Sequence, residues 1–333
     1  HVMKEQMGMN PLLVSVDNFS WTDVGRQNFA NINEAFGCDV LVLSLNKALA
    51  KKMARKGFEH NLVPNWYWDM AVYAYPIRMG INMNIPLIMY GENVSVEYGG
   101  VQTEETPSAM SQINNNVVTP IDWNVWCTDG VTMKDLNTCI YPTMDEIKSA
   151  KLEPVYLSYY HNWDGGKNYE LAKEKGFRPL GDEWKREGFI EDYDQIDAIG
   201  YLVHPWFKYA KFGFFRATDV TGYWVRSGKI DKKEALNLIE EHDHKLDKRA
   251  LEDFLSFTGY SESEFWSVVD RFWNKDIFEN YIDNSEKFNL KGRLEQGATI
   301  NLFGYGFSGS GKTYTLTEGA DKDPSIMKQF IDE

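Results

Sequence analysis

Short apolar runs alternate with longer stretches of helical periodicity over the first 160 residues, and this alternation constrains the fold most strongly. It predicts strands over residues 12–16, 40–43, 86–89 and 155–159, and helices over 2–8, 23–36, 47–56 and 66–82. Two strands that are separated by a helix of this length are joined by a crossover, which makes them parallel. The sequence therefore predicts an α/β fold with a parallel sheet and helices on both of its faces.

The sequence changes character beyond residue 190 and becomes helical. Apolar residues recur at helical spacing in Lys232–His242 and in Lys248–Phe257, and Ser261-Glu262-Ser263-Glu264 has the pattern of a helix N-terminus with acids in its first turn. Residues 101–143 break the earlier alternation, and we interpret them as an insertion or lid. We expect an α/β domain over residues 1–160, a mainly helical region over 161–283 and a tail over 284–333.

Composition and charge exclude several classes of protein. The net charge of −14 argues against a nucleic-acid backbone or an anionic membrane as the main partner. The sequence contains no uncharged apolar run of about 18 residues, so we expect no membrane-spanning helix. Hydrophobic residues make up 43% of the chain and aromatic residues 14%, which favours a large folded core over disorder.

The cysteines and the N-terminal residues indicate a reducing compartment. Cys38, Cys127 and Cys139 are an odd number at scattered spacings, which fits neither a disulfide framework nor a zinc site. The first residues, His1-Val2-Met3-Lys4, run directly into a polar segment and lack the pattern of a secretory signal. We therefore expect a cytoplasmic protein.

The segment Tyr90–Gly100 is the least suited to packing. It follows the apolar run Ile85–Met89 and contains Gly-Glu-Asn, a second glutamate and two adjacent glycines. Glycines allow backbone N–H groups to approach a ligand closely, and two carboxylates suit a metal ion, an ammonia nucleophile or a sugar hydroxyl. Ligands of open α/β sheets bind at the carboxyl ends of strands. The alternative interpretation is a turn with solvated acids.

An ordered set of segments resembles one known family. The segments are Asn10–Asn18, Thr22–Phe29, Tyr75–Arg78, Tyr90–Gly100, Phe215–Asp219 and Glu252–Leu255. In this order they resemble the N-acetyl sugar amidotransferases of bacterial surface-sugar biosynthesis, the WbpG/PseA-like family. The resemblance covers roughly residues 1 to 283, and the ordered set is more specific than any single segment.

The resemblance implies a fold, a reaction and partners. The family is similar to the adenine nucleotide alpha hydrolases, the branch that cleaves ATP to AMP and pyrophosphate. ATP, with Mg²⁺, would activate the carbonyl oxygen of an N-acetyl group on a sugar. Ammonia from a separate glutaminase subunit would then displace AMP and leave an acetamidino group. Such sugars occur in lipopolysaccharide and, as pseudaminic acid, on flagellin. The protein would contribute orientation and charge stabilisation rather than a covalent nucleophile.

The resemblance also implies the residues of the site. They are Glu92 and Asn93 for catalysis, Val16, Asp17 and Gly91 for the nucleotide, and Glu97, Tyr98, Arg216 and Asp219 for the substrate. Val16 and Asp17 close the strand where this fold holds adenosine. Glu92 and Asn93 could hold Mg²⁺, ammonia or the acetamido group. Structural alternatives remain, with Asp17 as a helix cap and with Arg216 paired to Asp219 in a scaffold ion pair.

Two parts of the family pattern are missing from this sequence. The phosphate loop, Ser-Gly-Gly-x-Asp-Ser, would lie just before the helical segment 1–8, and the sequence begins after that point. The cysteine pairs that the family usually carries near its N-terminus are also absent, so the resemblance implies no protein-bound metal. We therefore expect this chain to be incomplete and to lack ATP-dependent amidotransfer as it stands.

A second phosphate-binding motif lies near the other end of the chain. Gly306–Thr313 fits the pattern G-x-x-x-x-G-K-[ST] and follows a strand-like run over residues 298–303. Loop N–H groups would cradle the phosphates of a nucleotide. The implied nucleotide-binding residues are Gly306, Gly311, Lys312, which would reach the terminal phosphates, and Thr313, which would ligate Mg²⁺.

The tail motif leaves two alternative functions open. Its sequence resembles the P-loop of kinesin-type motors, but a motor domain needs several further strands and helices, so we interpret it as a fused or truncated fragment. One alternative is a P-loop nucleotide-binding protein in which the tail is the active part. The other is a pseudoenzyme that keeps the sugar pocket and only binds.

Overall fold

The parallel strands expected from the sequence are present. A computed structural model describes residues 1–91, 106–113, 118, 121–161, 164–181, 183–274 and 278. Strand β1 (Leu13–Val16) pairs in parallel with β2 (Val40–Leu43), and β3 (Leu87–Tyr90) pairs in parallel with β4 (Glu153–Tyr156). The described strands form two sheets of two strands each. The α/β class of this region and the helical character of the C-terminal region are confirmed.

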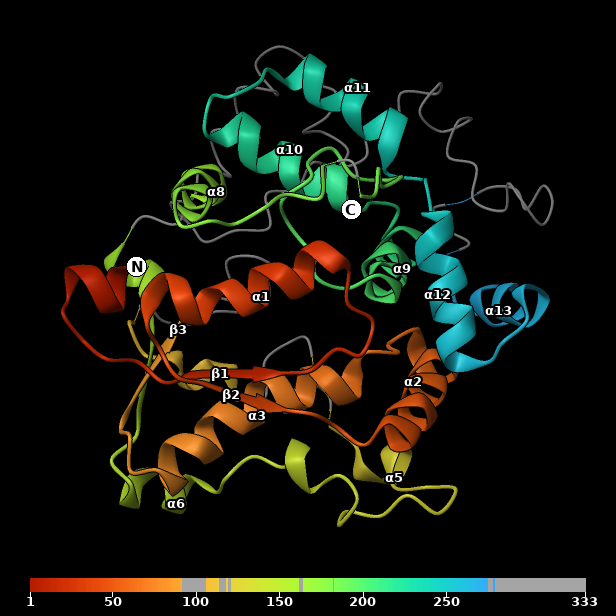
Figure 1. Cartoon of the computed structure of the whole chain (residues 1–333). Helices are drawn as coiled ribbons and strands as arrows, with labels where there is room; N and C mark the ends of the chain where they lie inside the picture. The colour runs from red at the N-terminus through yellow and green to blue at the C-terminus, as the bar shows by residue number, and fades with distance from the viewer. Residues whose placement is uncertain are drawn as a thin grey trace, which may run out of the picture.

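Helices cover both faces of the β1–β2 pair. Helix α1 (Asp23–Phe36) lies above these strands in Figure 1 and α3 (Trp66–Asn82) lies below them. Helix α2 (Lys47–Asn61) is capped by Asn46, whose side chain accepts a hydrogen bond from Leu49 N at 3.0 Å. Helix α3 contacts both β1 and β3, so a single helix packs against both pairs of strands.

The described part of residues 101–143 packs against α3. It contains the short helices η2 (Ala109–Gln112), α5 (Trp123–Trp126) and η3 (Asn137–Cys139), and α6 (Met144–Ser149) follows. The indole of Trp126 stacks on that of Trp66 with ring centroids 3.8 Å apart, and Cys139 is fully buried. These contacts make the described part of the segment a layer of the core.

The C-terminal region is built from helices. They are α7 (Leu157–Tyr160), α8 (Gly165–Glu174), η4 (Gly200–Leu202), α9 (Val203–Phe212), α10 (Arg216–Arg226), α11 (Lys232–His242), α12 (Lys248–Thr258) and α13 (Glu262–Val269). The helix start predicted at Ser261 is confirmed, because Ser261 and Glu264 form a capping box. None of the helices in the described ranges is long and apolar enough to cross a membrane.

Three predicted boundaries are wrong. The strand expected over residues 155–159 ends at Tyr156, where α7 begins. The segment expected as helix 2–8 is the single π-helical turn η1 (Val2–Gln6). Helix α2 runs to Asn61, one turn beyond the predicted end, because its last turn buries Phe58 in the core.

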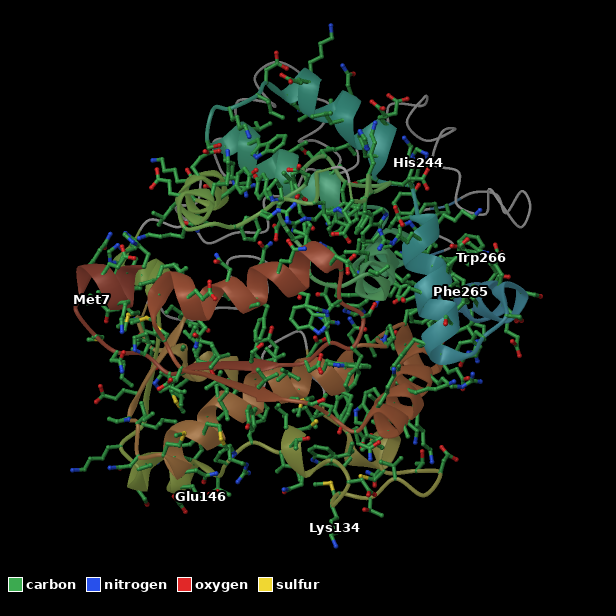
Figure 2. The ribbon with its side chains drawn as sticks, in the orientation of Figure 1. Met7, Lys134, Glu146, His244, Phe265 and Trp266 are labelled. Carbon is green, nitrogen blue, oxygen red and sulfur yellow. The ribbon has the colours of Figure 1, made fainter. Side chains whose placement is uncertain are left out.

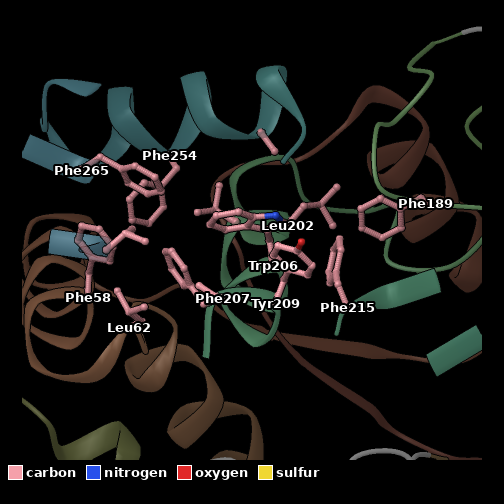
Figure 3. Packing of buried hydrophobic residues seen from close by; sticks show 14 of the residues in the cluster. Phe58, Leu62, Phe189, Leu202, Trp206, Phe207, Tyr209, Phe215, Phe254 and Phe265 are labelled. Carbon is pink, nitrogen blue, oxygen red and sulfur yellow. The ribbon is translucent and has the colours of Figure 1, made fainter. Parts of the chain in front are cut away.

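One aromatic core joins the two regions. Phe58 of α2 packs against Phe207 of α9 and Phe254 of α12, with ring centroids 5.4 Å apart in both pairs. Figure 3 shows these rings facing one another across the core, together with Phe265 of α13. Figure 2 places Phe265 and Trp266 beside α12, and their rings lie 5.1 Å apart. The α/β region and the helical region are therefore packed as one body.

Candidate functional site

A cavity lies at the carboxyl end of β1, between the α/β region and the C-terminal helices. Its volume is about 200 Å³. The aromatic walls come from Trp68, Tyr201, Phe254 and Phe257, and the polar lining consists of Asn18, Ser20, Asn65, Gln195, Asp69, Asp197 and Asp253. A pocket with aromatic walls and a few converging polar groups is the usual form of a small-molecule site.

Asp17 shapes the loop that leads into this cavity. Its Oδ1 accepts hydrogen bonds from Trp21 Nε1 at 2.8 Å and from Phe19 N at 3.1 Å, and its Oδ2 accepts one from Ser44 Oγ at 3.2 Å. Burial alone would raise the pKa of this carboxyl, but the hydrogen bonds outweigh it and hold the pKa below its usual value. Asp17 therefore organises the loop, while the preceding Val16 lines the cavity.

Asp17 is not the helix cap that the sequence offered as an alternative. The cap of α1 is Thr22, whose Oγ1 accepts a hydrogen bond from Gly25 N at 2.8 Å. The same hydroxyl donates to the carbonyl oxygen of Ile196 at 2.6 Å, so the start of α1 is tied to the C-terminal half of the chain. A Cβ at Gly25 would lie 2.5 Å from Asp197 Cα, which makes glycine necessary for this close approach.

The loop after β1 and residues 196–199 run side by side. Ile199 N donates to Ser20 O at 2.8 Å, and Thr22 N donates to Asp197 O at 3.1 Å. An antiparallel bridge joins Trp21 to Ala198. This strip places Asp197 and Asn18 on the same cavity.

The carboxylates of Asp253 and Asp197 are held in different ways. Asp253 Oδ2 accepts hydrogen bonds from Gly200 N at 3.0 Å and from Ser20 Oγ. Asp197 Oδ2 accepts one from Asn18 Nδ2 at 3.2 Å. Asp197 is exposed as a residue, yet protein atoms surround its carboxyl, and this desolvation raises its pKa above the usual value.

The lining of the cavity is acidic. None of its described lining residues is a lysine, arginine or histidine, whereas three are aspartates. Carboxylate and amide oxygens accept hydrogen bonds from hydroxyl and N–H groups, and aromatic faces take up flat or weakly polar rings. Phosphate groups would meet like charge in this cavity. The arrangement suits an uncharged or cationic ligand that is rich in hydrogen-bond donors.

Arg216 and Asp219 do not pair with each other, so the predicted alternative of a scaffold pair between them is wrong. Arg216 forms an ion pair with Asp194 and lies 3.7 Å from Glu191 through its Nε. Asp219 pairs with Lys208 at 2.6 Å. Neither Arg216 nor Asp219 belongs to the described lining of the cavity. Their assignment to substrate stays a prediction.

The other implied site residues are only partly described. Gly91 directly follows β3, and burial raises the pKa of the neighbouring Tyr90 phenol. Glu92, Asn93, Glu97, Tyr98, Gly306, Gly311, Lys312 and Thr313 lie outside the described residues. The roles of these eight residues stay predictions.

Sequence reasoning missed most of the polar lining. Asp253 and Phe254 belong to a segment that carried the family resemblance, so a signal for them existed. Asp197 and Tyr201 stood in no such segment. They reach the site because residues 196–199 run beside the loop after β1. This contact joins distant segments, so no local sequence pattern predicts it.

Comparison with known proteins identifies a relationship for the C-terminal region. Residues 187–291 match the family described as "LPS biosynthesis protein WbpG-like, C-terminal domain". A search of curated proteins gave no match to the chain. The matched stretch supports the WbpG-like family, and it supplies Gln195, Asp197, Tyr201 and Asp253 to the cavity.

Proposed function

We propose that this cavity is part of the site of an ATP-dependent amidotransferase that acts in the cytoplasm. It would convert the N-acetyl group of a lipopolysaccharide or flagellin sugar into an acetamidino group, with ammonia from a glutaminase partner. One observation carries the proposal. The cavity lies at the carboxyl end of a parallel strand, and residues of the WbpG-like stretch form half of its lining.

The cavity residues are suited to orient the acetamido group. Its carbonyl oxygen can accept a hydrogen bond from the side-chain amide of Asn18 or Gln195, both of which line the cavity. The sugar ring can lie against the faces of Trp68 and Phe257. Fixing the amide in this way holds the reacting carbon in place for attack and keeps bulk water from it.

ATP supplies the adenylyl group that turns the amide oxygen into a leaving group. The acidic lining repels phosphate. The adenylyl phosphorus bonds to the amide oxygen itself as pyrophosphate leaves, so this oxygen would lie at the mouth of the cavity, with the neutral sugar ring inside and the phosphates outside. In the described ranges, no cluster of three or more His, Cys, Asp or Glu side chains could hold Mg²⁺. We derive no step through this ion.

The test is AMP release from ATP in the presence of an N-acetylated nucleotide sugar and ammonium, measured with a full-length version that carries the phosphate loop of the family, because we expect no amidotransfer by this chain as it stands. Val72 lines the cavity and is 44% exposed, so Val72→Trp fills the cavity without disturbing the core. We expect this variant to lower AMP release about tenfold or more, because the indole would occupy the space of the bound ring, and a tenfold change corresponds to about 1.4 kcal/mol.

A matched control separates cavity filling from a general effect of tryptophan. Val42 of β2 has similar exposure, 41%, but is not among the described lining residues. Val42→Trp should leave AMP release unchanged. AMP release that does not depend on the sugar, or that is unchanged in Val72→Trp, would show that the cavity takes no part in the reaction. Sugar binding without any AMP release would instead favour the binding-only alternative.

A further inference from the structure

The charge of the cavity differs from that of an ordinary polar pocket. Asp69, Asp197 and Asp253 line it, and its described lining includes no cationic side chain. Asp197 and Asp253 reach the cavity from two sides, from the strip beside the loop after β1 and from α12. A cleft that carries charges of one sign concentrates ligands of the opposite sign.

The hydrogen bonds of these carboxylates leave acceptor capacity for a ligand. Asp197 accepts one side-chain hydrogen bond within the described residues, from Asn18. Gly200 N and Ser20 Oγ both donate to the same oxygen of Asp253, Oδ2. An ionised carboxylate offers about four lone-pair sites on its two oxygens.

Aromatic side chains form the remaining walls. Trp68, Phe254 and Phe257 line the same cavity as the carboxylates. A flat cation gains from contact with an aromatic face as well as from charge-assisted hydrogen bonds at its edge. Few ligand groups use both at once, and planar cations with N–H groups on their edges, such as amidinium and guanidinium, are the typical ones.

We propose that this cavity binds an amidinium cation, whose N–H groups donate to Asp197 and Asp253 while its plane lies against the aromatic wall. The inference rests on the proposed function, since the acetamidino product carries such a cation. It also extends that function, because a cavity that favours the charged product over the neutral N-acetyl substrate favours the formation of positive charge on the attacking nitrogen.

The experiment compares acetamidinium chloride with acetamide, a neutral molecule of nearly the same shape. Binding to the whole chain is followed by tryptophan fluorescence, since Trp68 lines the cavity. We expect acetamidinium to bind about tenfold more tightly than acetamide, and its affinity to fall as salt is raised.

Two substitutions locate the effect. Asp197→Asn and Asp253→Asn keep the shape of the side chain and remove one negative charge each, and each should weaken acetamidinium binding about fivefold or more while leaving acetamide unchanged. Asp197→Asn is the decisive variant if Asp253→Asn fails to fold. Asp145, an exposed acid in the first turn of α6, provides the control, and Asp145→Asn should change neither affinity.

Each outcome decides the inference. Equal affinity for the two probes, or acetamidinium binding that is unaffected by Asp197→Asn, would overturn it. Preferential acetamidinium binding that is lost in Asp197→Asn supports it, even if the chain releases no AMP, in which case only the proposed function is lost. AMP release without acetamidinium binding would keep the proposed function and remove this inference.

Discussion

Asp194 and Asp197 stand in the same loop, yet the structure uses them in opposite ways. Asp194 pairs with Arg216 in a cluster that also contains Arg186 and Glu191, and the side chains of Arg186 and Glu191 are each 2% exposed. Asp197 lines the cavity and is bonded to the neutral amide of Asn18. The first acid pairs with a cation within the fold, whereas the side-chain partner of the second is a neutral amide.

The difference separates acids that hold the fold from acids that are available for chemistry. A buried charge is costly unless a partner compensates it, so Glu191, whose side chain is 2% exposed, needs its arginines more than Asp194 does, whose side chain is 45% exposed. Asp197 and Asp253 instead line the cavity, and their side-chain partners are the neutral groups of Asn18 and Ser20. Proximity in sequence is an incomplete guide to this distinction, because Arg186 lies five residues before Glu191, whereas Arg216, which pairs with Asp194, lies 22 residues away in α10.

The largest expected effect is a loss of stability when Arg186, the buried partner of Glu191, is replaced. Arg186 Nη1 donates to the carbonyl oxygens of Asp194 at 2.8 Å and Gln195 at 3.0 Å, and its Nη2 lies 3.2 Å from Glu191 Oε2. Arg186→Met leaves Glu191 buried with much less compensation. We expect a loss of about 3–5 kcal/mol in the free energy of unfolding, measured by urea denaturation.

An exposed arginine provides the control for that substitution. Arg249 lies 3.8 Å from Glu183, and its side chain is 42% exposed. Arg249→Met should cost less than about 1 kcal/mol, because exposed ion pairs contribute little. If both variants lost the same stability, the cluster would not be the buried scaffold described above.

Asp243 is a third kind of acid, buried without a cationic partner in a salt bridge among the described residues, and its contribution to stability should depend on pH. Asp243 is buried and accepts hydrogen bonds from Phe215 N at 2.9 Å and Thr218 N at 3.1 Å, and from the Thr218 hydroxyl. Burial raises its pKa to about 6 from 3.8. The folded state then binds the proton more tightly than the unfolded state, so this group stabilises most below about pH 4 and loses that contribution as pH rises through 6.

The expected change is measured as a difference between parent and variant. Asp243→Asn removes the titration, so the stability of the parent relative to the variant should fall by about 2 kcal/mol between about pH 4 and pH 7. Urea unfolding at several pH values gives this difference, in which all other groups cancel. A difference that stays constant would show that Asp243 keeps the same pKa in both states.

Glu264 should give the opposite sign. Hydrogen bonds from the hydroxyl of Ser261 and from its backbone N–H lower the pKa of the Glu264 carboxyl. Its contribution is therefore present above the unfolded pKa and lost as pH falls. Glu264→Gln should cost more stability near pH 7 than near pH 3.

How much the sequence could predict follows from the range of the interactions. Helices α1 and α3 and strand β2 match their predicted bounds, because periodicity and local caps such as Thr22 determine them. The alternation of strands and helices fixes parallel pairing, which is confirmed. It does not fix which strands are neighbours, and the described strands divide into two pairs.

The candidate site depends on contacts that no local pattern records. Ser20 bonds to Asp253 across 233 residues, and Asn18 bonds to Asp197 across 179. The run from Val155 to Tyr159 has the pattern of a strand, yet helix α7 begins at Leu157 and β4 ends at Tyr156. A single sequence therefore located the strand end at Val16 but not the acids that converge on it.

The smallest expected effect concerns the ion pair between Lys208 and Asp219. The charged atoms of the pair lie 2.6 Å apart, and the two side chains are 27% and 31% exposed. The pair is therefore more exposed than the cluster of Arg186 and Glu191, whose side chains are 2% exposed. A double-mutant cycle with Lys208→Met and Asp219→Asn should give a coupling of about 0.2–1 kcal/mol, reduced by salt. If Asp219 contacts the substrate, as the family resemblance implies, Asp219→Asn should also lower amidotransfer in a full-length version while Lys208→Met leaves it unchanged. Equal effects of both substitutions on stability, with no separate effect of Asp219→Asn on activity, would place Asp219 with the scaffold acids and leave Asp197 and Asp253 as the acids of the site.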